Sequence, residues 1–312
     1  MLYAVVITLA MSSAISFEGN NLAEKLGYGV DDKLLIVHAD DVGMSHSANI
    51  ATAKALDTGI VTCGSIMVPC PWFPEVAAYC RENADVDLGI HLTLTSEWKY
   101  YRWRPVTSKD KVPGLIDEEG FLWHTTGDVG KHAKPEEVEM ELRAQIERAL
   151  EYGIKPTHLD THMGTVFARP EFLEIYVRLA KEYGIPPMLP KPTPEIMHHV
   201  EHLGQEKLIA FYKTVQEQGY PLLDILVTGV GGKTYEEKKA AYHKKLRELK
   251  PGVNQIIVHL GMDDNEMKGI TSSHEARYID FLVFTDPETQ TLIDEMDIKL
   301  IGWKDIKQAV DF

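Results

Sequence analysis

Acidic and histidine side chains stand at the ends of four apolar segments of this chain. Asp40 and Asp41 follow the first segment, His91 lies in a second, a His-Asp-His triplet lies in a third, and His259 ends a late one. One carboxylate and two neutral imidazoles form an open metal site that leaves room for water and substrate. Such a metal lowers the pKa of a water and polarises a carbonyl group, so these residue types predict a metal-dependent hydrolase.

The triplet His158, Asp160 and His162 is the sharpest of the four signals. Alternate residues of a strand point to one face, so these three side chains are expected to share a face. Ionisable groups on a buried face are costly unless they pair or bind a ligand. Taken alone, a strand histidine is more often a core residue, and an Asp-Asp pair is equally well a turn or a helix cap. The four groups together favour the metal site.

The chemistry needs further groups beside the ligands. A second carboxylate can take a proton from the water, a histidine on the opposite side can protonate the leaving amine, and another aspartate can orient a ligand histidine. Consecutive strand residues point apart, so Asp40 and Asp41 can both face the metal only if the chain turns there. We expect Val42 and Gly43 to provide that turn.

Alternating elements must position these groups. Apolar runs predict strands over residues 34–37, 61–68, 88–94, 157–162, 187–189, 222–227, 254–260 and 298–303. Helical periodicity predicts helices over residues 46–58, 73–83, 135–152, 170–183, 195–218, 235–249, 275–284 and 287–296, and a short last helix. This alternation indicates a parallel sheet with right-handed crossovers. We therefore expect an α/β fold, a single-domain (β/α) barrel of seven or eight parallel strands.

Residues 95–134 show no regular periodicity, and such a long irregular stretch inside a compact domain is usually functional. It contains Trp98 and Trp103, whose aromatic faces suit a sugar ring. A loop that packs its own small core explains the same residues equally well. Arg169 and Arg277 could either reach the site or cap helices, and the sequence does not decide between these roles.

Charge and cysteine content exclude several classes of function. The formal net charge is −15, which argues against nucleic acid or an anionic membrane as a partner. The three cysteines are too few for a disulfide framework, and their spacing matches no zinc pattern. A Cys70–Cys80 bridge stays open if the protein is exported. The sequence contains no other candidate membrane span and leaves a homo-oligomer open.

The amino-terminal segment resembles an export signal in part. Residues 2–11 are nearly all apolar, and the small residues Ser12 and Ala14 follow, although no basic residue precedes the run. A buried first strand or helix is the alternative. We expect residues 1–32 to be a signal segment and lead-in, and residues 33–312 to be the barrel domain. If residues 1–14 are a signal, the protein is periplasmic or extracellular, and otherwise it is cytoplasmic.

Three motifs, over residues 38–45, 89–95 and 158–162, resemble those of the YdjC-like carbohydrate deacetylases, in their order and spacing. That family includes the ChbG chitooligosaccharide deacetylases and the hopanoid-associated HpnK group. The resemblance implies a modified (β/α) barrel related to the polysaccharide deacetylases. It also implies removal of acetyl groups from N-acetylated mono- or oligosaccharides with one divalent ion, Mg²⁺ or Zn²⁺.

Carried over by position, the resemblance implies that Asp41, His91 and His162 bind the metal. Asp40 is then the general base and His259 the general acid. Supporting or substrate contacts are expected from His158, Asp160, Trp98 and Trp103. The chain departs from the family pattern after His162, where further histidines are usual, and after His259, where proline is usual. Both departures change residues at the rim of the site, so the resemblance does not identify the substrate.

Two other functions fit the same residues. The water-activating site could hydrolyse esters or phosphoesters, or the barrel could bind carbohydrate without catalysis. Ester hydrolysis without amide turnover would favour the first, and sugar binding that survives Asp40→Asn without turnover would favour the second. Two histidines and one aspartate suit zinc or iron and, less tightly, magnesium.

Overall fold

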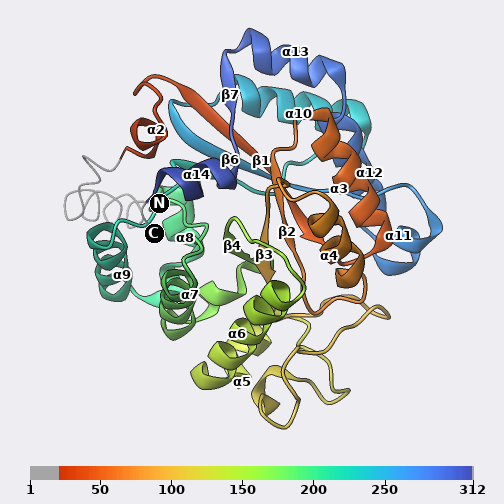
Figure 1. Ribbon diagram of the computed structural model, residues 1–312, viewed down its shortest axis with the longest axis vertical. Helices are drawn as coiled ribbons and strands as arrows, with labels where there is room; N and C mark the ends of the chain where they lie inside the picture. The colour runs from red at the N-terminus through yellow and green to blue at the C-terminus, as the bar shows by residue number, and fades with distance from the viewer. Residues whose placement is uncertain (1–20, 311–312) are drawn as a thin grey trace.

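A seven-stranded parallel sheet forms the centre of the computed structural model, which describes residues 21–310 (Figure 1). The strand order is β4-β3-β2-β1-β6-β5, and β7 pairs with the first residues of β1. The strands are β1 (Lys33–Val42), β2 (Cys63–Ile66), β3 (Leu88–Leu92), β4 (Leu159–Thr161), β5 (Ile225–Val227), β6 (Gly252–His259) and β7 (Ile298–Leu300). The predicted α/β class and parallel pairing are confirmed.

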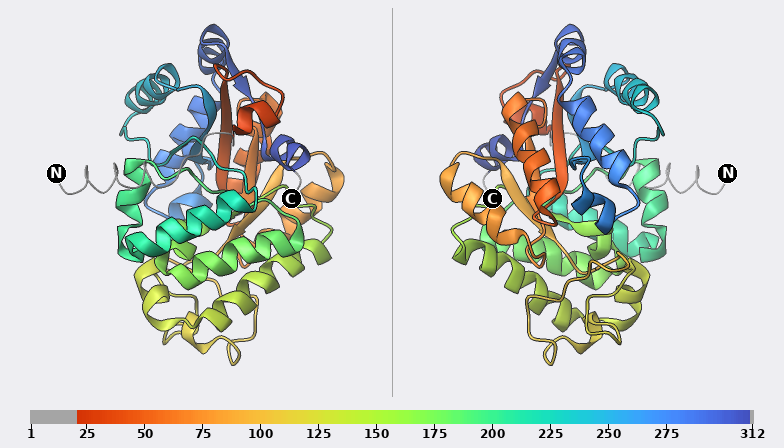
Figure 2. Two further views of the ribbon diagram at one scale, coloured as in Figure 1. Left: turned by 90° about the vertical axis from the view of Figure 1, so that its left-hand side faces the viewer. Right: turned by 90° about the vertical axis from the view of Figure 1, so that its right-hand side faces the viewer.

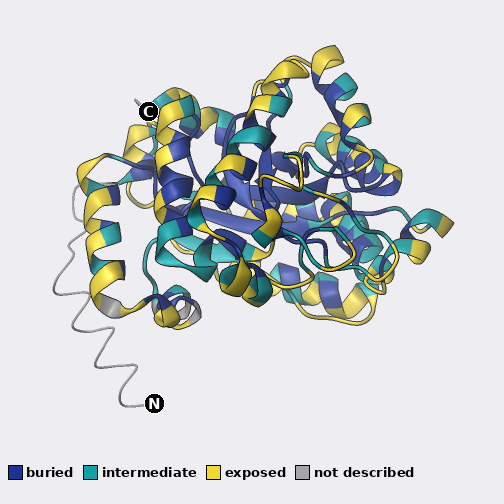
Figure 3. Cartoon of the chain, turned by 90° about the horizontal axis from the view of Figure 1, so that it is seen from below, coloured by how far each residue is buried: buried dark blue, intermediate teal, exposed yellow. Residues whose placement is uncertain are grey.

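Helices surround the sheet (Figure 2), and Figure 3 shows their exposed outer faces around a buried layer of strands. The α-helices are α2 (Leu22–Lys25), α3 (His46–Thr58), α4 (Phe73–Glu82), α5 (Thr126–His132), α6 (Pro135–Glu151), α7 (Pro170–Tyr183), α8 (Pro194–His199), α9 (Gln205–Glu217), α10 (Tyr235–Arg247), α11 (Asn265–Ile270), α12 (His274–Phe284), α13 (Pro287–Glu295) and α14 (Trp303–Ala309). The 3₁₀ segments are η1 (Pro113–Leu115), η2 (His162–Ala168) and η3 (Glu201–Leu203).

The sheet is a half barrel whose edge strands are β4 and β5. The predicted strand over residues 187–189 forms only isolated bridges, between Leu159 and Pro187 and between Pro190 and Leu223. These bridges place that segment between β4 and the residues that lead into β5. Proline cannot donate to a backbone ladder, which explains why the segment does not become a full strand. The modified barrel is confirmed in this open form.

Three helical regions differ from the prediction. The region 195–218 divides into α8, η3 and α9: Val200 separates α8 from η3, and Gly204, with a φ of +85°, separates η3 from α9. Residues 126–132 form α5 inside the stretch that was expected to be irregular. The Thr125 side chain caps this helix by accepting a hydrogen bond from the backbone N–H of Asp128. Residues 265–270 form the short helix α11. Helices of six or seven residues contain too little periodicity to be recognised in a sequence.

The turn from β1 into α3 fixes the first site segment. β1 is buried along almost its whole length, as expected for a strand covered on both faces. Ser45 begins α3 by accepting a hydrogen bond from Ala48 N, and Gly59 ends it at φ +82°. Both boundaries are as predicted, and the short connection keeps Asp40 and Asp41 at the carboxyl end of the sheet.

Part of the first described helix and all three cysteines are buried in the core. The segment expected to be a signal lies in residues 1–20, outside the described residues. The packed body begins before residue 33, because Leu22 and Ala23 of α2 are buried in the core. The three cysteines are buried and free, so no Cys70–Cys80 bridge forms. In the described part of the chain, no helix has the length and apolar character needed to cross a membrane.

Candidate metal centre and active site

A bulge near the end of β1 turns two consecutive acids toward the same place. β1 advances three residues, from Ala39 to Val42, while β2 advances two, so Asp40 and Asp41 oppose a single residue. Asp41 takes a left-handed φ of +64°, which is uncommon for a residue with a side chain. The turn was expected at Val42 and Gly43. It occurs one residue earlier, inside the strand, although Gly43 also has a positive φ, of +90°.

Asp41, His91 and His162 meet at the carboxyl ends of β1, β3 and β4, and we call these three residues the metal corner. Asp41 Oδ1 lies 3.4 Å from His91 Nε2 and 3.2 Å from His162 Nδ1. The two ring nitrogens lie 3.2 Å apart. Ligand atoms about 2.0–2.1 Å from a tetrahedral ion lie about 3.3 Å from one another. The spacing of the three atoms therefore fits a metal site.

A carboxylate holds each imidazole of the metal corner from behind. His91 Nδ1 lies 2.7 Å from Asp160 Oδ1, and His162 Nε2 lies 3.1 Å from Glu97 Oε2. A proton on the nitrogen that faces the carboxylate leaves a lone pair on the nitrogen that faces the corner. The Ser65 hydroxyl donates to Asp160 Oδ2 at 3.0 Å and keeps that carboxylate in place. Both rings are thus oriented as metal ligands require.

Asp41 gives separate evidence for a positively charged ligand. Its Oδ2 accepts a hydrogen bond from Arg277 Nη2 at 2.6 Å, but its buried Oδ1 has no hydrogen-bond donor among the described residues. Leaving a buried carboxylate oxygen without a partner is costly. Burial alone would raise the pKa of Asp41, but the Arg277 guanidinium and the two imidazoles hold it well below its usual value. An ionised carboxylate and two imidazoles fit a divalent cation.

The acidic surroundings also shift the two imidazoles in the metal-free protein. Burial opposes a charged ring on His91, but Asp160 and Asp40 raise its pKa well above the usual value. Burial opposes the charge on His162 too, and Glu97 and Asp41 outweigh it and raise the pKa to about 9. A metal must displace protons from both rings, so its binding depends on pH.

Asp40 and His259 lie beside the metal corner. Asp40 Oδ2 lies 3.8 Å from His91 Nε2 and 3.9 Å from His259 Nε2. The His259 side chain is 42% exposed and faces a cleft, whereas the Asp40 side chain is only 10% exposed. Desolvation by the cleft walls lowers the pKa of His259, so its ring is neutral at neutral pH. Both groups are placed to exchange protons with a molecule in the cleft.

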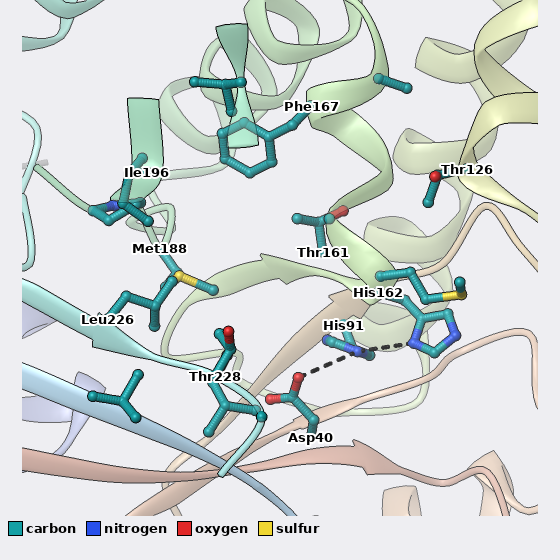
Figure 4. A pocket seen from close by; sticks show the side chains of 18 of the residues that line it. Asp40, His91, Thr126, Thr161, His162, Phe167, Met188, Ile196, Leu226 and Thr228 are labelled. Atoms are coloured by element: carbon teal, nitrogen blue, oxygen red, sulfur yellow. Dashed lines mark hydrogen bonds and ion pairs between the residues drawn. The ribbon is translucent and has the colours of Figure 1, made fainter. Parts of the chain in front are cut away.

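The cleft has a volume of about 1380 Å³ and two unlike ends. Figure 4 shows Asp40, His91 and His162 close together at one end, with Met188, Ile196 and Leu226 across the cavity. Most of its lining away from the corner is apolar. Five aliphatic side chains on that side, which we call the apolar wall, are Met188, Ile196, Val200, Leu226 and Ile257.

The long loop lies beyond the carboxyl ends of β2 and β3 (Figure 1), and two of its tryptophans, Trp98 and Trp103, pack together. Trp103 is 2% exposed, and its Nε1 donates to the Thr95 carbonyl at 2.9 Å. Its ring centroid lies 5.3 Å from that of Trp98 and 6.4 Å from that of His162. The Trp103 ring is buried inside the loop's own core, so a supporting contact to His162 fits its position better than a sugar-binding face. Trp98 is half-buried and lies over Arg277.

The remaining predicted residues lie under the metal corner rather than in the cleft. His158 and Asp160 are fully buried on one face of β4 and its approach, as the alternation predicted. Asp160 contacts His91, whereas His158 contacts His38 at 2.6 Å between their Nε2 atoms. Arg169 bonds Glu171 and the Ala133 carbonyl at the start of α7.

Three residues complete the site that the motifs alone did not assign. His38 alternates with Asp40 along β1, so strand periodicity could have placed both on one face. Glu97 lies five residues beyond β3 in the long loop, where no periodic signal exists. Arg277, whose role the sequence left open, lies 236 residues from Asp41 in the chain and reaches it from α12.

Known proteins are similar to this chain in sequence and in fold. The family model described as YdjC-like protein matches residues 34–295. A carbohydrate deacetylase of Thermus thermophilus is 31% identical over 93% of this chain and 99% of its own length, and one of Thermoanaerobacter pseudethanolicus is 28% identical over 88% and 100%. A solved "putative cellobiose-phosphate cleavage protein" of Enterococcus faecalis has the same fold, with a TM-score of 0.73 and 23% identity over 88% of this chain and 99% of its own. The chain belongs to the YdjC-like protein family.

Proposed function

We propose that this protein is a metal-dependent carbohydrate deacetylase that releases acetate from N-acetylated mono- or oligosaccharides. The observation that carries the proposal is the metal corner, with Asp40 and His259 beside it at one end of the cleft. The names of the curated relatives support the substrate class, and their matches cover nearly the whole length of both chains.

The ligand atoms follow from the contacts. Asp41 Oδ1, His91 Nε2 and His162 Nδ1 would hold one Mg²⁺ or Zn²⁺ ion. When bound, the ion would polarise the acetyl carbonyl and lower the pKa of a nearby water. Asp40 Oδ2 faces the same point and is the acceptor for the proton of that water.

His259 returns the proton to the leaving group. Its ring is neutral and its Nε2 lies 3.9 Å from Asp40 Oδ2, so a proton taken up by Asp40 can pass to the histidine and then to the departing nitrogen. The water oxygen forms a bond to the acetyl carbon, and the bond from that carbon to nitrogen breaks. Water is consumed, acetate and the amino sugar leave, and Asp40 and His259 regain their starting protonation.

Acetate release from N-acetylglucosamine and its oligomers tests the proposal. Metal-depleted protein should be inactive and should recover with Mg²⁺ or Zn²⁺. Asp40→Asn should retain metal but lose about 10²–10⁴-fold in kcat, as expected for a general base. Asp57→Asn, an exposed acid on α3, is the matched control and should behave as wild type. A metal-loaded protein that releases no acetate from a broad panel of acetylated sugars contradicts the proposal, and turnover of esters alone favours an esterase.

A further inference from the structure

A chain of buried hydrogen bonds runs from Asp40, at the carboxyl end of the sheet, to Asp87, at the amino-terminal end of the sheet. Asp40 Oδ1 lies 2.7 Å from His38 Nδ1, and His38 Nε2 lies 2.6 Å from His158 Nε2. His158 Nδ1 lies 3.0 Å from Thr157 Oγ1, which donates to Asp87 Oδ1 at 2.5 Å. Asp40 lies near the carboxyl end of β1, whereas Thr157 and Asp87 lie just before β4 and β3.

We propose that His38, His158, Thr157 and Asp87 form a proton relay that positions Asp40 and shifts one proton between the active site and the amino-terminal end of the sheet. Its use in turnover rests on the proposed function, but its hydrogen bonds do not. None of the four residues lines the cleft, and both histidines are fully buried. They are therefore positioning residues that act through Asp40, and the hydrolysis steps described above do not otherwise need them.

The backbone around the chain leaves space for it. A Cβ atom on Gly89 would lie 2.6 Å from ring atoms of His158, and one on Gly302 would overlap Asp87 Oδ2. His158 stacks on Trp303 with ring centroids 5.0 Å apart. The backbone N–H of Lys304 donates to Asp87 Oδ2 at 2.8 Å and fixes the far end. Glycine at two close approaches, together with these fixed partners, indicates a built arrangement rather than an incidental contact.

The donors and acceptors can be satisfied in two complete ways. In the first state, His38 is an imidazolium that donates to Asp40 and to His158 Nε2. His158 Nδ1–H then donates to Thr157, whose hydroxyl donates to the Asp87 carboxylate. In the second state, one proton has moved from His38 Nε2 to His158 Nε2, one from His158 Nδ1 to Thr157 Oγ1, and one from Thr157 to Asp87. Both histidines are then neutral, Asp87 is a carboxylic acid, and no proton has entered or left.

Burial and the hydrogen bond to Asp40 decide between these states. Burial opposes a charged ring on His38, but the hydrogen bond and charge of Asp40 raise its pKa. Burial and the charge of His38 lower the pKa of His158 well below its usual value, and burial raises the pKa of Asp87. The hydrogen bond between His38 and Asp40 therefore favours the first state, whereas the second state removes the two buried charges on His38 and Asp87. The relay thereby holds Asp40 in place and keeps one movable proton behind it.

Other charged groups face the chain from its surroundings. Asp160 Oδ2 lies 3.8 Å from His38 Nε2 and favours its charged form, whereas His91 opposes it. The charge of Lys307, on α14, acts against protonation of His158, and that of Asp305 raises the pKa of Asp87. Both α14 groups therefore lie at the far end of the relay, where they resist a second proton on His158 and favour one on Asp87.

NMR of the full chain with ¹⁵N-labelled histidine tests the relay without any activity measurement. In the metal-free protein at neutral pH, we expect both ring nitrogens of His38 to be protonated and His158 to carry its proton on Nδ1. Thr157→Val removes the hydroxyl with little change of volume and would leave that Nδ1–H without a partner. We therefore expect His158 to move its proton to Nε2 and His38 to become neutral, and Thr157→Ser to restore the wild-type pattern.

Thr52→Val is the matched control, because Thr52 is also buried and its hydroxyl has no partner among the described residues. It should leave both rings unchanged. In an active enzyme, Thr157→Val should lower kcat about tenfold, at the low end of effects on proton transfer, with KM and metal affinity unchanged. Thr157→Ser should restore kcat. Unchanged protonation of both rings in Thr157→Val overturns the relay, whereas the expected NMR change without acetate release contradicts only the proposed function.

Discussion

The metal corner and the apolar wall face the same cleft but are held in opposite ways. Each corner residue has a fixed partner behind it, and these partners are Arg277 for Asp41, Asp160 for His91 and Glu97 for His162. The wall consists of aliphatic side chains from β5, β6, α8 and the residues just before α8. Such side chains give apolar contact area to a bound molecule, and apolar contacts have no preferred direction. Catalysis depends on the exact placement of reacting groups, whereas apolar binding does not. Under the proposed function, the corner would set the reaction and the wall would set affinity.

Removal of a ligand from the metal corner should produce the largest loss of bound metal and of acetate release. A substitution in the apolar wall should leave the metal content unchanged. His162→Ala removes one of three ligand atoms, so we expect loss of stoichiometric metal and of measurable acetate release. Leu226→Ala, at the wall, should bind metal as the wild type does. Elemental analysis of both purified variants makes the comparison. Full metal content in His162→Ala would show that the corner is not the metal site.

Substitution of the carboxylates that hold the imidazoles should lower metal affinity less than loss of a ligand does, but more than a substitution in the apolar wall does. Asp160→Asn and Glu97→Gln keep the side-chain size but remove the charge that orients each ring, so we expect metal affinity to fall about 10–100-fold. Asp160 should give the greater loss, since its side chain is 1% exposed and that of Glu97 is 21% exposed. Titration calorimetry with the metal measures both.

Glu139→Gln is the control for that pair, because Glu139 bonds Arg143 and Arg178 on the outer faces of α6 and α7, away from the metal corner. Its metal affinity should equal that of the wild type. Equal affinity in Asp160→Asn would mean that packing, and not the carboxylate, orients His91.

The corner was predictable from sequence because strand geometry converts spacing into proximity. His91 and the triplet ending in His162 lie at ends of parallel strands, which must meet at one edge of the sheet. The two acids of β1 were placed correctly at the edge, but the left-handed Asp41 that aims them was not foreseen. A local backbone conformation of this kind depends on the bulge against β2, which no spacing along β1 encodes.

The wall and the partners were less predictable because their contacts are long-range and lack a period. Residues 187–189 are held by isolated bridges, and the 3₁₀ segment η3 separates α8 from α9, so no regular pattern marks the wall. Arg277 reaches Asp41 only through the packing of α12 on the sheet. Trp103 was an ambiguous aromatic signal, and its burial resolves it in favour of the loop core.

Proton competition gives the corner a pH dependence that the wall lacks. The pKa of His162 in the metal-free protein is raised to about 9, above the ordinary value of about 6.5 in an unfolded chain. Protonated His162 therefore stabilises the metal-free fold, fully below about pH 6.5, and this stability is lost as pH rises through about 9. Because the metal needs the neutral ring, its affinity should rise over the same window.

Metal titrations at several pH values, with thermal melts of the metal-free protein, check both directions. Glu97→Gln removes the main charge that raises the pKa of His162, so it should shift the window to lower pH. A metal affinity independent of pH between 6.5 and 9 would contradict the assignment of His162 as a ligand.

The smallest effect should come from the wall itself and should appear in KM alone. Leu226→Ala removes three carbons from a half-buried side chain, which corresponds to about 1 kcal/mol and about a fivefold rise in KM. kcat and metal content should stay as in the wild type, because the chemistry lies at the other end of the cleft. Leu150→Ala, on the outer face of α6 and 42% exposed, is the control for the same chemical change. A loss of kcat in Leu226→Ala would show that the wall also orients the reacting group. The corner and the wall would then not have the separate roles in catalysis and binding inferred above.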